Sequence, residues 1–346
     1  MNPADKMVVL PSLIVDNIDI FVCPACGGDL AITEDHLRMG CSSCHRTFES
    51  ENGIPLLFWL NEEDTSDEVT IDVRSFYEKN PFPGYEDIDS PSHLREKAER
   101  GVFARLLDEQ VPPFSKILEV GCGTGQLSNF LGMTWGRTVF ATDISLNSLK
   151  LGHQFKQQNE IHYVAFLQMN LFHPVFRPGS FDLVICNGVL HHTKDPFLGF
   201  RSILRLVRQD GFIIVGLYNT YGRILTDIRR FIFKISGRRF KFLDPRLREE
   251  DLSERRKEIW FRDQYENPQE SKHTIGEVLG WFDRCGVEYT NSIPKSKAFE
   301  TFSPQEKLFE THPRVTRLDR FIVQSSMLLS GGKEGGFFIM IGRKTY

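Results

Sequence analysis

The sequence predicts a doubly wound α/β fold, in which a mostly parallel sheet carries helices on both faces, together with a small N-terminal zinc ribbon. Three observations lead to this prediction. Apolar runs of strand length alternate with segments whose apolar residues recur every three or four positions. A glycine-rich turn at residues 121–125 joins the first such strand to the following helix. Two C-x-x-C pairs stand ahead of it, near the start of the chain.

The length and composition describe an ordinary globular protein. The 346 residues are enough for two domains, and 40% of them are hydrophobic and 25% charged. The net charge of −4 argues against a surface that coats nucleic acid generally, and we expect no DNA partner. No apolar run is long enough to cross a membrane. The apolar stretch at 7–15 is interrupted by Pro11 and lacks a cleavage site, so we expect no export and a cytoplasmic location.

Four cysteines have the spacing of a zinc site. Cys23 and Cys26 form the first C-x-x-C pair, and Cys41 and Cys44 form the second, with 14 residues between the pairs. Two such pairs can converge on one tetrahedral ion, and four thiolates leave no open coordination position. We therefore expect structural Zn²⁺ in a reducing compartment rather than a disulfide framework. His45 could compete as a ligand, but it is more simply a surface residue beside the second pair.

The segment 52–57, Asn-Gly-Ile-Pro-Leu-Leu, ends the predicted ribbon. With the cysteine pairs, it resembles the small zinc-ribbon protein that partners and activates tRNA and release-factor methyltransferases, which ends its fold in a similar strand. The resemblance implies a zinc-ribbon module over residues 1–60, fused ahead of the rest of the chain. Its role could be stabilisation, activation or substrate recognition. We favour stabilisation, because zinc binding supplies most of the folding free energy of so small a unit.

The first predicted strand of the sheet, residues 116–120, runs into a tight turn and a helix. The turn holds three glycines at alternate positions, which are Gly121, Gly123 and Gly125. Such a turn lets a ligand lie against bare backbone N–H groups at the helix N-terminus. Glu119 stands two residues before the first glycine, and Asp143 follows the next apolar run, 138–142. An acid at the tip of that strand suits the two hydroxyls of a ribose.

Over residues 114–218 the sequence resembles the class I S-adenosylmethionine-dependent methyltransferases, in their ubiquinone- and menaquinone-type branch. The resemblance implies a Rossmann-like seven-stranded sheet whose last two strands, at 287–293 and 337–343, form an antiparallel edge. It also implies S-adenosylmethionine as cofactor, with its methionine part held by Glu119 and the three glycines, and its ribose held by Asp143. The G-x-G-x-G spacing differs from the G-x-G-x-x-G of nicotinamide-binding proteins, so an oxidoreductase is a distant alternative.

The resemblance extends to the ends of the next two strands. The third strand leads to Asn170, where the family usually has an acid or amide near the adenine, and an amide oxygen can accept a hydrogen bond from the adenine amino group. The fourth strand ends at Asn187, which we assign to the cofactor, and is followed by His191 and His192. Ligands of doubly wound sheets lie beyond the carboxyl ends of the strands, so these side chains are expected near the transferred methyl.

The two histidines have two possible roles. One of them could be a general base, because imidazole titrates near neutral pH, and His191 is slightly favoured over His192. Alternatively, both form local hydrogen bonds and shape the pocket wall. A base is not obligatory, since a sulfonium is already an activated methyl donor and positioning can supply most of the acceleration.

Residues 61–113 are expected to form an acidic linker and a lid. Residues 61–70 contain five acids and no base, which suits a solvated linker. Residues 73–85 are rich in aromatics and prolines, and a charged helix is expected over about 92–108. Several methyltransferases of this type place such a segment over cofactor and substrate. The lid residues would be Phe76, Tyr77, Phe82 and Tyr85. An equally favoured alternative is that these side chains serve only to attach the linker to the core.

The predicted methyltransferase domain, 114–346, has two insertions, at about 220–272 and 294–335, which we expect near the pocket mouth. Between residues 223 and 248 there are nine Lys or Arg and two acids. The apolar residues of this stretch fall at helical spacing, and they are Ile224, Ile228, Phe231, Ile232 and Ile235. Three interpretations stay open: a helical cap packed on the core, which we favour, a cradle for an anionic substrate or RNA, and contact with an anionic membrane surface.

Together these features predict an enzyme that transfers a methyl group from S-adenosylmethionine to an acceptor that the sequence does not identify. A small-molecule or lipid-linked acceptor, with anionic compounds among the candidates, is favoured over RNA, which is the first alternative. The second alternative is a cofactor-binding regulatory module without turnover. Peripheral membrane contact through the basic insertion is a further expectation, and the oligomeric state is left open.

Overall fold

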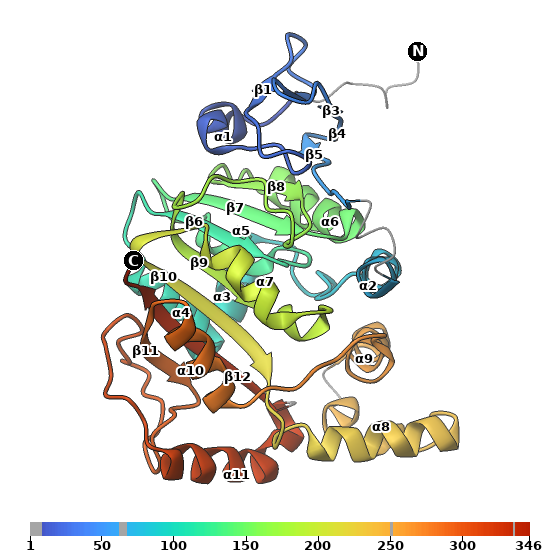
Figure 1. Cartoon of the computed structure of the whole chain (residues 1–346). Helices are drawn as coiled ribbons and strands as arrows, with labels where there is room; N and C mark the ends of the chain where they lie inside the picture. The colour runs from blue at the N-terminus through green and yellow to red at the C-terminus, as the bar shows by residue number, and fades with distance from the viewer. Residues whose placement is uncertain (1–8, 62–67, 250–251, 335) are drawn as a thin grey trace.

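A seven-stranded sheet forms the centre of the computed structural model, which describes residues 9–61, 68–249, 252–334 and 336–346 (Figure 1). Its strand order is β11-β12-β10-β9-β6-β7-β8. The five parallel strands are β6 (Lys116–Val120), β7 (Thr138–Asp143), β8 (Val164–Gln168), β9 (Phe181–Asn187) and β10 (Val207–Tyr218). The antiparallel edge consists of β12 (Phe337–Lys344) and β11 (Val287–Ile293). The predicted seven-stranded sheet with an antiparallel edge is therefore confirmed.

Hydrophobic clusters cover both faces of this sheet. Neighbouring residues of β6 enter different clusters, Leu118 one and Ile117 the other, because successive side chains of a strand point to opposite faces. One cluster is completed by α7 (Pro196–Leu204) and α10 (Ile275–Arg284), and the other by α4 (Val102–Gln110), α5 (Gln126–Leu131) and α6 (Leu146–Gln158). Burial on both faces explains why the parallel strands read as continuous apolar runs.

Hydrogen-bonding side chains cap the starts of α6 and α7. Ser145 caps α6 by accepting a 3.2 Å hydrogen bond from the backbone N–H of Ser148. Asp195 caps α7 in the same way, and Pro196 occupies the first helical position, where a missing N–H costs nothing. These caps set the depth at which each helix leaves its preceding strand.

The N-terminal residues fold as a small ribbon against one edge of the sheet (Figure 1). Its antiparallel strands are β1 (Leu30–Ile32), β2 (Met39–Cys41) and β3 (Thr47–Phe48), followed by the hairpin β4 (Ser50–Glu51) and β5 (Ile54–Pro55), with the short helix α1 (Ser12–Val15) ahead of them. Phe21 packs its ring 5.7 Å from that of Phe140 in β7. The backbone of Leu57 bonds Gln168 at the end of β8. The ribbon therefore shares a hydrophobic core with the sheet, and the module boundary at residue 60 stays a prediction.

Residues 68–113 are more helical than the sequence suggested. The helix α2 (Glu68–Lys79) begins inside the stretch expected to be a solvated linker, of which 62–67 lie outside the described residues. The single charged helix expected over about 92–108 is two helices, α3 (Pro91–Arg100) and α4, separated at Gly101. Glu78 ties α2 to the start of α6, because its carboxylate accepts hydrogen bonds from the backbone N–H groups of Leu146 and Asn147.

Both insertions contain helices. The first holds α8 (Ile224–Ser236), the 3-10 turns η4 (Lys241–Leu243) and η5 (Arg246–Arg248), α9 (Glu254–Phe261) and the π-helical turn η6 (Arg262–Glu266). The second contains α11 (Arg317–Glu334), and Gly336 lies beside Gly222 near the start of α8. None of the helices in the described ranges combines the length and apolar character of a membrane-spanning segment.

The orientation of α8 corrects the favoured interpretation of its apolar stripe. We expected this stripe to pack on the core, but Ile228, Phe231 and Ile235 are 51%, 67% and 71% exposed. The buried side of the helix is the opposite one, where Phe233 packs with Phe261 and Tyr265 of α9 and η6. Aromatic side chains of the same insertion thus hold the helix from its other side.

Candidate active site

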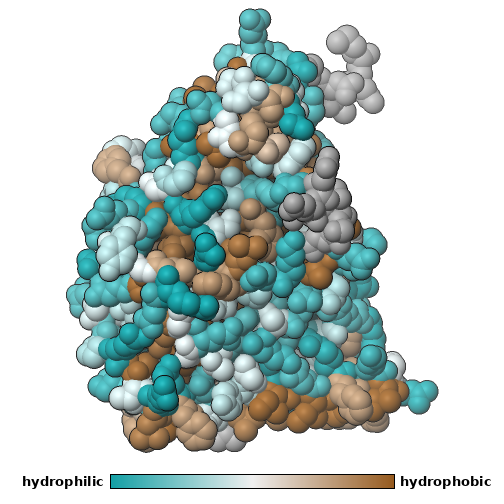
Figure 2. Space-filling model, viewed as in Figure 1, coloured by the Kyte–Doolittle hydropathy of each residue, from teal (hydrophilic) through white to brown (hydrophobic). Residues whose placement is uncertain are grey.

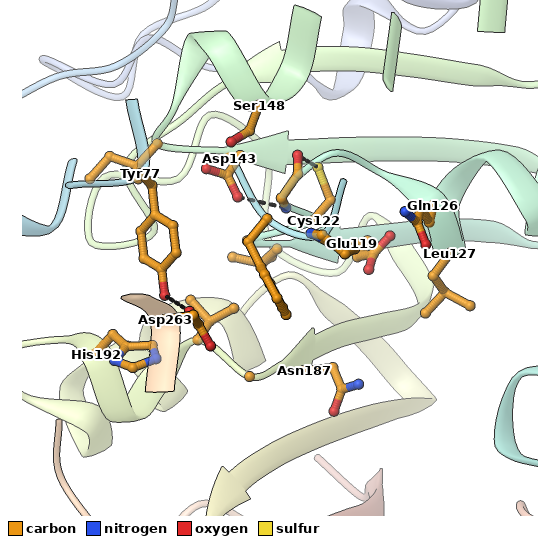
Figure 3. A pocket seen from close by; sticks show the side chains of 18 of the residues that line it. Tyr77, Glu119, Cys122, Gln126, Leu127, Asp143, Ser148, Asn187, His192 and Asp263 are labelled. Carbon is orange, nitrogen blue, oxygen red and sulfur yellow. Dashed lines mark hydrogen bonds between the residues drawn. The ribbon is translucent and has the colours of Figure 1, made fainter. Parts of the chain in front are cut away.

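A cavity of about 590 Å³ lies beyond the carboxyl ends of β6, β7 and β9 (Figure 3). This is the place where doubly wound sheets bind ligands. Most of the residues selected from the sequence line it, namely Tyr77, Phe82, Glu119, Gly121, Gly123, Asp143, Asn170, Asn187 and His192. Four others do not, and they are Phe76, Tyr85, Gly125 and His191.

The glycine turn brings bare backbone to the cavity wall. Gly121 and Gly123 have φ angles of +69° and +55°, a left-handed conformation that favours glycine. A Cβ on Gly123 would lie 2.1 Å from the carbonyl oxygen of Phe82, and one on Gly121 would lie 2.3 Å from the Val189 side chain. Gly125 stands at the N-cap of α5 and packs against Phe166, and its contact with the cofactor stays a prediction. Neither Gly121 nor Gly123 could therefore carry a side chain without displacing its neighbour.

Asp143 ends β7 and points toward the glycine turn (Figure 3). One carboxylate oxygen accepts a 2.8 Å hydrogen bond from the backbone N–H of Gly123, and the other accepts one of 2.8 Å from Ser145. A carboxylate has about four lone-pair positions, so acceptor capacity remains for ligand hydroxyls. Burial raises the pKa of Asp143 to about 6, against the lowering effect of these two hydrogen bonds.

Glu119 is the second buried carboxylate at this end of the cavity. Its side chain is 7% exposed and accepts a hydrogen bond from the hydroxyl of Ser128 on α5. Burial raises the pKa of Glu119 to about 7, and the Ser128 hydrogen bond opposes the rise. Both carboxylates are costly to ionise in the free protein, which is typical of acids that face a ligand donor or cation.

Asn187 and Asn170 differ in how their side chains are used. The side-chain oxygen of Asn187 is buried and has no hydrogen-bond partner among the described residues, although Asn187 lines the cavity. A Cβ on Gly216 would lie 1.9 Å from this oxygen, so the oxygen packs against β10 and its contact with the cofactor stays a prediction. Asn170 instead donates to the Trp59 carbonyl at 3.0 Å and accepts from the Phe172 N–H at 3.1 Å. Its contact with an adenine stays a prediction.

The two histidines occupy different environments. The Nδ1 of His192 lies 2.6 Å from the carbonyl oxygen of Gln269, which can only accept, so Nδ1 carries the proton and Nε2 the lone pair. Burial lowers the pKa of His192, which keeps the ring neutral and able to take up a proton. His191 is stacked on Tyr218, with ring centroids 4.0 Å apart, and does not line the cavity. The geometry favours His192 as a base over His191, the residue slightly favoured from the sequence.

Residues 118–215 match the family model described as a methyltransferase domain. The match covers less than a third of the chain. It contains Glu119, the glycine turn, Asp143 and both histidines, so the predicted class of domain is confirmed where the motifs lie.

Known proteins resemble parts of the chain. An uncharacterised protein of Synechococcus is 26% identical over 250 residues, covering 64% of this chain and 60% of that protein. The ubiquinone biosynthesis O-methyltransferase of Thiobacillus denitrificans is 30% identical over 118 residues, covering 33% of this chain and 50% of that enzyme. The solved structure of PKMT2 from Rickettsia typhi with AdoHcy is 14% identical, with a TM-score of 0.49 over 72% of this chain and 53% of that one. The chain thus spans half to three fifths of these two curated relatives.

Segments outside the methyltransferase domain complete the cavity wall. Tyr77 of α2 donates a 3.0 Å hydrogen bond to the carboxylate of Asp263 in η6, and its ring stands edge-on to that of His192 (Figure 3). Sequence reasoning included Tyr77 as a lid residue but missed Asp263, which belongs to no motif. The only feature of the sequence that could have indicated Asp263 is a charged residue within an aromatic stretch.

The cavity wall also carries apolar side chains and two cations. The apolar lining includes Leu94, Ala98, Leu127, Phe130, Trp260 and Phe337. Lys97 of α3 donates a 2.8 Å hydrogen bond to the side-chain oxygen of Gln126, and burial lowers the pKa of Lys97 to about 8. Arg246 of η5 also lines the cavity, and its guanidinium lies 4.1 Å from the centre of the Trp260 ring.

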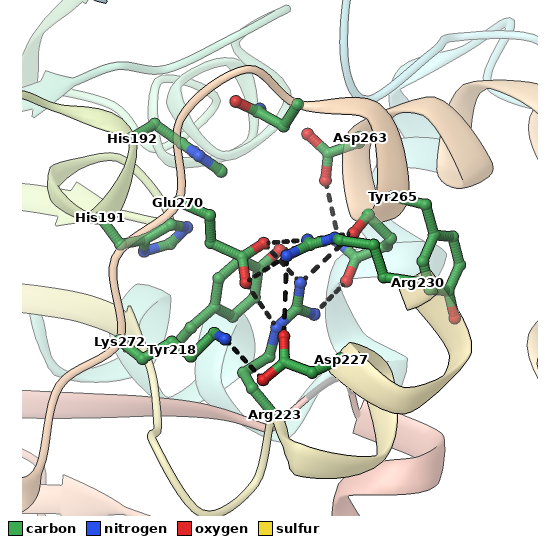
Figure 4. A network of polar contacts seen from close by, with 12 residues as sticks. His191, His192, Tyr218, Arg223, Asp227, Arg230, Asp263, Tyr265, Glu270 and Lys272 are labelled. Carbon is green, nitrogen blue, oxygen red and sulfur yellow. Dashed lines mark hydrogen bonds and ion pairs between the residues drawn. The ribbon is translucent and has the colours of Figure 1, made fainter. Parts of the chain in front are cut away.

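A buried ionic network holds the first insertion together beside Tyr218 at the end of β10 (Figure 4). The Glu270 carboxylate pairs with Arg223 and with Arg230, at 2.6 Å each. Arg223 is fully buried, lies 3.8 Å over the ring of Tyr218 and donates to the Gln264 side chain at 2.6 Å. Gln264 lines the cavity next to Asp263, so this network positions the wall that the insertion contributes.

The four predicted metal ligands lie together in the ribbon. Their sulfur atoms all lie within 4.8 Å of one another, with Cys23 and Cys44 3.7 Å apart and Cys26 and Cys41 3.5 Å apart. Sulfurs at the corners of a tetrahedron about Zn²⁺ are roughly 3.8 Å apart, given a Zn–S distance of about 2.3 Å. The backbone N–H groups of Gly28 and Cys44 point at the sulfurs of Cys26 and Cys41 at 3.4 Å. The donor set and its spacing fit a tetrahedral zinc ion.

Proposed function

We propose that the chain transfers a methyl group from S-adenosylmethionine to an acceptor bound in the same cavity. The observation that carries this proposal is the convergence of the glycine turn, Asp143 and His192 on one cavity at the carboxyl ends of the parallel strands. The cofactor supplies a methyl group on a sulfonium sulfur, which needs no further activation. The protein then has to bind, align and desolvate the two partners.

The cofactor end would be formed by the two carboxylates and the bare turn. Asp143 has lone pairs left to accept from ribose hydroxyls. Glu119 would stabilise the positively charged end of the ligand. Each of these contacts removes a burial cost that the free protein carries, which favours binding of a polar, cationic nucleoside.

The acceptor end would be managed by His192 and the apolar wall. His192 presents an unprotonated Nε2 to the cavity, where it can take the proton that an acceptor hydroxyl or amine loses as the methyl is transferred. The apolar lining with Lys97 and Arg246 suits an acceptor that has an apolar body and an anionic group. This is consistent with a small-molecule or lipid-linked acceptor, and one similar protein is a ubiquinone biosynthesis O-methyltransferase.

RNA is a weaker proposal for the acceptor. The RNA proposal depended on the basic insertion, but several Arg and Lys side chains of that insertion form ion pairs with glutamates of the protein. Arg223 and Arg230 pair with Glu270, and Arg238 and Lys241 pair with Glu258. These cations are therefore less available to phosphates, and phosphate binding is what would give RNA affinity its dependence on salt.

For the ribbon, we propose a structural Zn²⁺ held by Cys23, Cys26, Cys41 and Cys44. Four thiolates would leave no open position for chemistry. Leu57 and Trp59, just after the ribbon, contact Gln168 and Asn170 at the end of β8. A zinc-ordered ribbon would in this way stabilise the strand ends that border the cofactor cavity.

Calorimetry with S-adenosylhomocysteine and NAD tests the cofactor, and transfer of labelled methyl groups into fractionated cell extract tests turnover. We expect binding of the nucleoside with no binding of NAD, and label in an organic-solvent or small-molecule fraction. Label in RNA would support the alternative acceptor. Nucleoside binding without any labelled product, across all fractions, would favour the regulatory module. Failure to bind the nucleoside would overturn the proposal.

A further inference from the structure

The outward face of α8 is entirely apolar. Its residues Ile224, Ile228, Phe231 and Ile235 follow one another at helical intervals and are 40%, 51%, 67% and 71% exposed. At 100° per residue these four positions lie within about 60° of one another on the helix surface. Figure 2 shows apolar residues gathered along this lower edge of the molecule. A solvated helix ordinarily turns such a stripe inward, so this face is built to meet something other than water.

The apolar surface extends beyond the helix. In the residues after α8, Phe240 and Phe242 are 44% and 57% exposed. The helix α11 lies along the same edge of the molecule (Figure 1), and its Leu318 and Phe321 are 67% and 58% exposed. The backbones of Gly222 and Gly336 approach so closely that a Cβ on Gly222 would lie 2.6 Å from the Cα of Gly336. This contact lets α8 begin where α11 ends.

Unpaired cations stand beside the apolar face. Lys234 lies between Phe231 and Ile235 on the flank of the same helix, and Arg239 precedes Phe240. Neither Lys234 nor Arg239 has an ion-pair partner among the residues that the structure describes, and both are exposed. Other bases of the insertion, such as Arg230 and Arg238, are paired with acids. The charge left free at this face is therefore positive.

We propose that this α8 face, formed by Ile224, Ile228, Phe231 and Ile235 with Lys234 and Arg239, docks on an anionic membrane surface. The helix would lie in the plane of the headgroups, with its apolar side chains toward the acyl chains and its cations beside lipid phosphates. With 13 residues, α8 is about 20 Å long and too short to span a bilayer.

Charge and shape distinguish the membrane from other occupants. In a two-fold dimer through this face, Lys234 and Arg239 would lie against their own copies or against the same apolar residues, with no acid to neutralise them. RNA would meet the cations but leave the apolar side chains in water. An anionic bilayer accepts both kinds of side chain at once, because its phosphates lie next to its acyl region.

The docking face is joined to the candidate active site through the buried network. Arg223, next to the first residue of α8, donates to Gln264, which lines the cavity. The same insertion places Asp263 and Arg246 in the cavity wall. Docking would therefore hold the cavity close to the bilayer, so that the acceptor is a membrane lipid or a lipid-linked compound. This last consequence rests on the proposed function, whereas the docking itself does not.

Flotation of the full chain with lipid vesicles tests the proposal. We expect binding to vesicles of phosphatidylcholine mixed with phosphatidylglycerol, weaker binding to phosphatidylcholine alone, and partial loss in high salt. The double substitution Phe231→Ser and Ile235→Ser should lower the partition coefficient by about tenfold or more. Lys234→Glu should weaken binding to the mixed vesicles only. The matched control is Phe114→Ser with Trp135→Ser, two rings that are 69% and 67% exposed elsewhere, and it should bind as the wild type does.

Further measurements make each result decisive. No flotation of the wild type, or equal loss in the control pair, overturns the docking proposal. A concentration-dependent dimer in ultracentrifugation that the α8 pair dissociates, without vesicle binding, assigns the face to a second copy instead. Circular dichroism on the same preparations shows whether each variant is folded. Vesicle binding without nucleoside binding would refute the proposed function and leave the docking intact.

Discussion

The backbone N–H of Gly123 donates a 2.8 Å hydrogen bond to the carboxylate of Asp143, which links the glycine turn to the tip of the neighbouring strand. The turn and the acid are 20 residues apart in sequence and meet because β6 and β7 are adjacent and parallel. Their contact fixes the distance between the bare backbone of the turn and the acceptor oxygens of Asp143. Two of the best sequence signals thus form one unit in the fold.

Substitution of Gly123 by Ala should disrupt this unit. The residue has a φ of +55°, and a Cβ there would lie 2.1 Å from the carbonyl oxygen of Phe82, which is backbone and cannot move alone. We expect a loss of more than about 1 kcal/mol in the free energy of unfolding and a matching loss of nucleoside affinity. Urea unfolding and calorimetry measure the two effects. Gly40→Ala, where no atom lies within 4 Å of the new Cβ, is the control and should change neither.

Cofactor affinity should depend on pH through the two buried carboxylates. Burial raises the pKa of Asp143 to about 6 and that of Glu119 to about 7, so both are protonated in the free protein at acid pH. Ribose hydroxyls and a cationic ligand group favour the ionised carboxylates, so binding must expel these protons. Affinity should fall as pH is lowered from about 8 to 5, approaching tenfold per pH unit for each group below its pKa.

The same raised pKa values act oppositely on the stability of the free protein. A carboxyl whose pKa is higher in the folded state holds its proton more tightly there, so the free energy of unfolding falls as pH rises toward and past the folded pKa. Calorimetric titrations and melting curves over the same pH range separate the two trends. Asp143→Asn should bind weakly and flatten the Asp143 part of the affinity profile. An unchanged profile in this variant would contradict the assigned role.

Glu270 should be essential for the position of the first insertion. It neutralises both Arg223 and Arg230, and Arg223 is fully buried. Glu270→Gln removes the carboxylate that both guanidinium groups share, so we expect a loss of about 3–5 kcal/mol in the free energy of unfolding. Chemical denaturation followed by circular dichroism measures it. Glu288→Gln removes the partner of Arg343 in a pair that is about two-fifths exposed and should cost less than about 1 kcal/mol.

The strands and the turn could be predicted because their signals are local. The run 116–120 is buried on both faces and therefore consists largely of apolar residues. It is followed at once by a turn with left-handed φ angles, and such angles favour glycine, so the turn is visible in the sequence. Asp143 was recognisable because it ends the next such run. The four cysteines likewise carry their chemistry in their spacing. These features depend on residues within one strand–turn–helix unit or on a fixed ligand spacing.

The rest of the site depends on contacts that no local pattern contains. Tyr77 and Asp263 are 186 residues apart and meet only because the first insertion folds back over α2. The helical period of α8 correctly groups Ile228 with Ile235, but it cannot say which side faces the core. That choice is made by Phe233 and its partners Phe261 and Tyr265, which lie on the insertion itself. The two histidines are the same residue type, and only the fold shows that His192 lines the cavity whereas His191 does not.

Removal of zinc should destabilise the sheet as well as the ribbon. The ribbon and the strands share one hydrophobic cluster, in which Phe21 packs with Phe140 and Phe176. A metal chelator should therefore lower the main melting temperature rather than melt a separate N-terminal unit, and Cys41→Ser should have the same effect. Metal analysis and calorimetry provide the measurements. Cys285→Ser, at a half-buried cysteine outside the cluster of four, should retain zinc and melt normally. Absence of zinc from the purified wild type would contradict the assignment.

The final prediction separates the two histidines. His192→Ala removes the cavity-facing Nε2, so transfer of labelled methyl groups should slow by about 10²–10⁴-fold while S-adenosylhomocysteine still binds. His191→Phe should retain activity within a few-fold, because neither ring nitrogen of His191 has a hydrogen-bond partner in the described structure and a phenyl ring can pack on Tyr218 in its place.

The pH dependence of the rate distinguishes a base from a shape-filling ring. Because burial lowers the pKa of His192, the wild-type rate should stay constant above neutral pH and fall only at acid pH, where the ring takes up a proton. His192→Asn retains a side-chain donor for the Gln269 carbonyl but has no basic nitrogen. If this variant transfers methyl groups at the wild-type rate, His192 only shapes the wall, and alignment of the partners accounts for the catalysis.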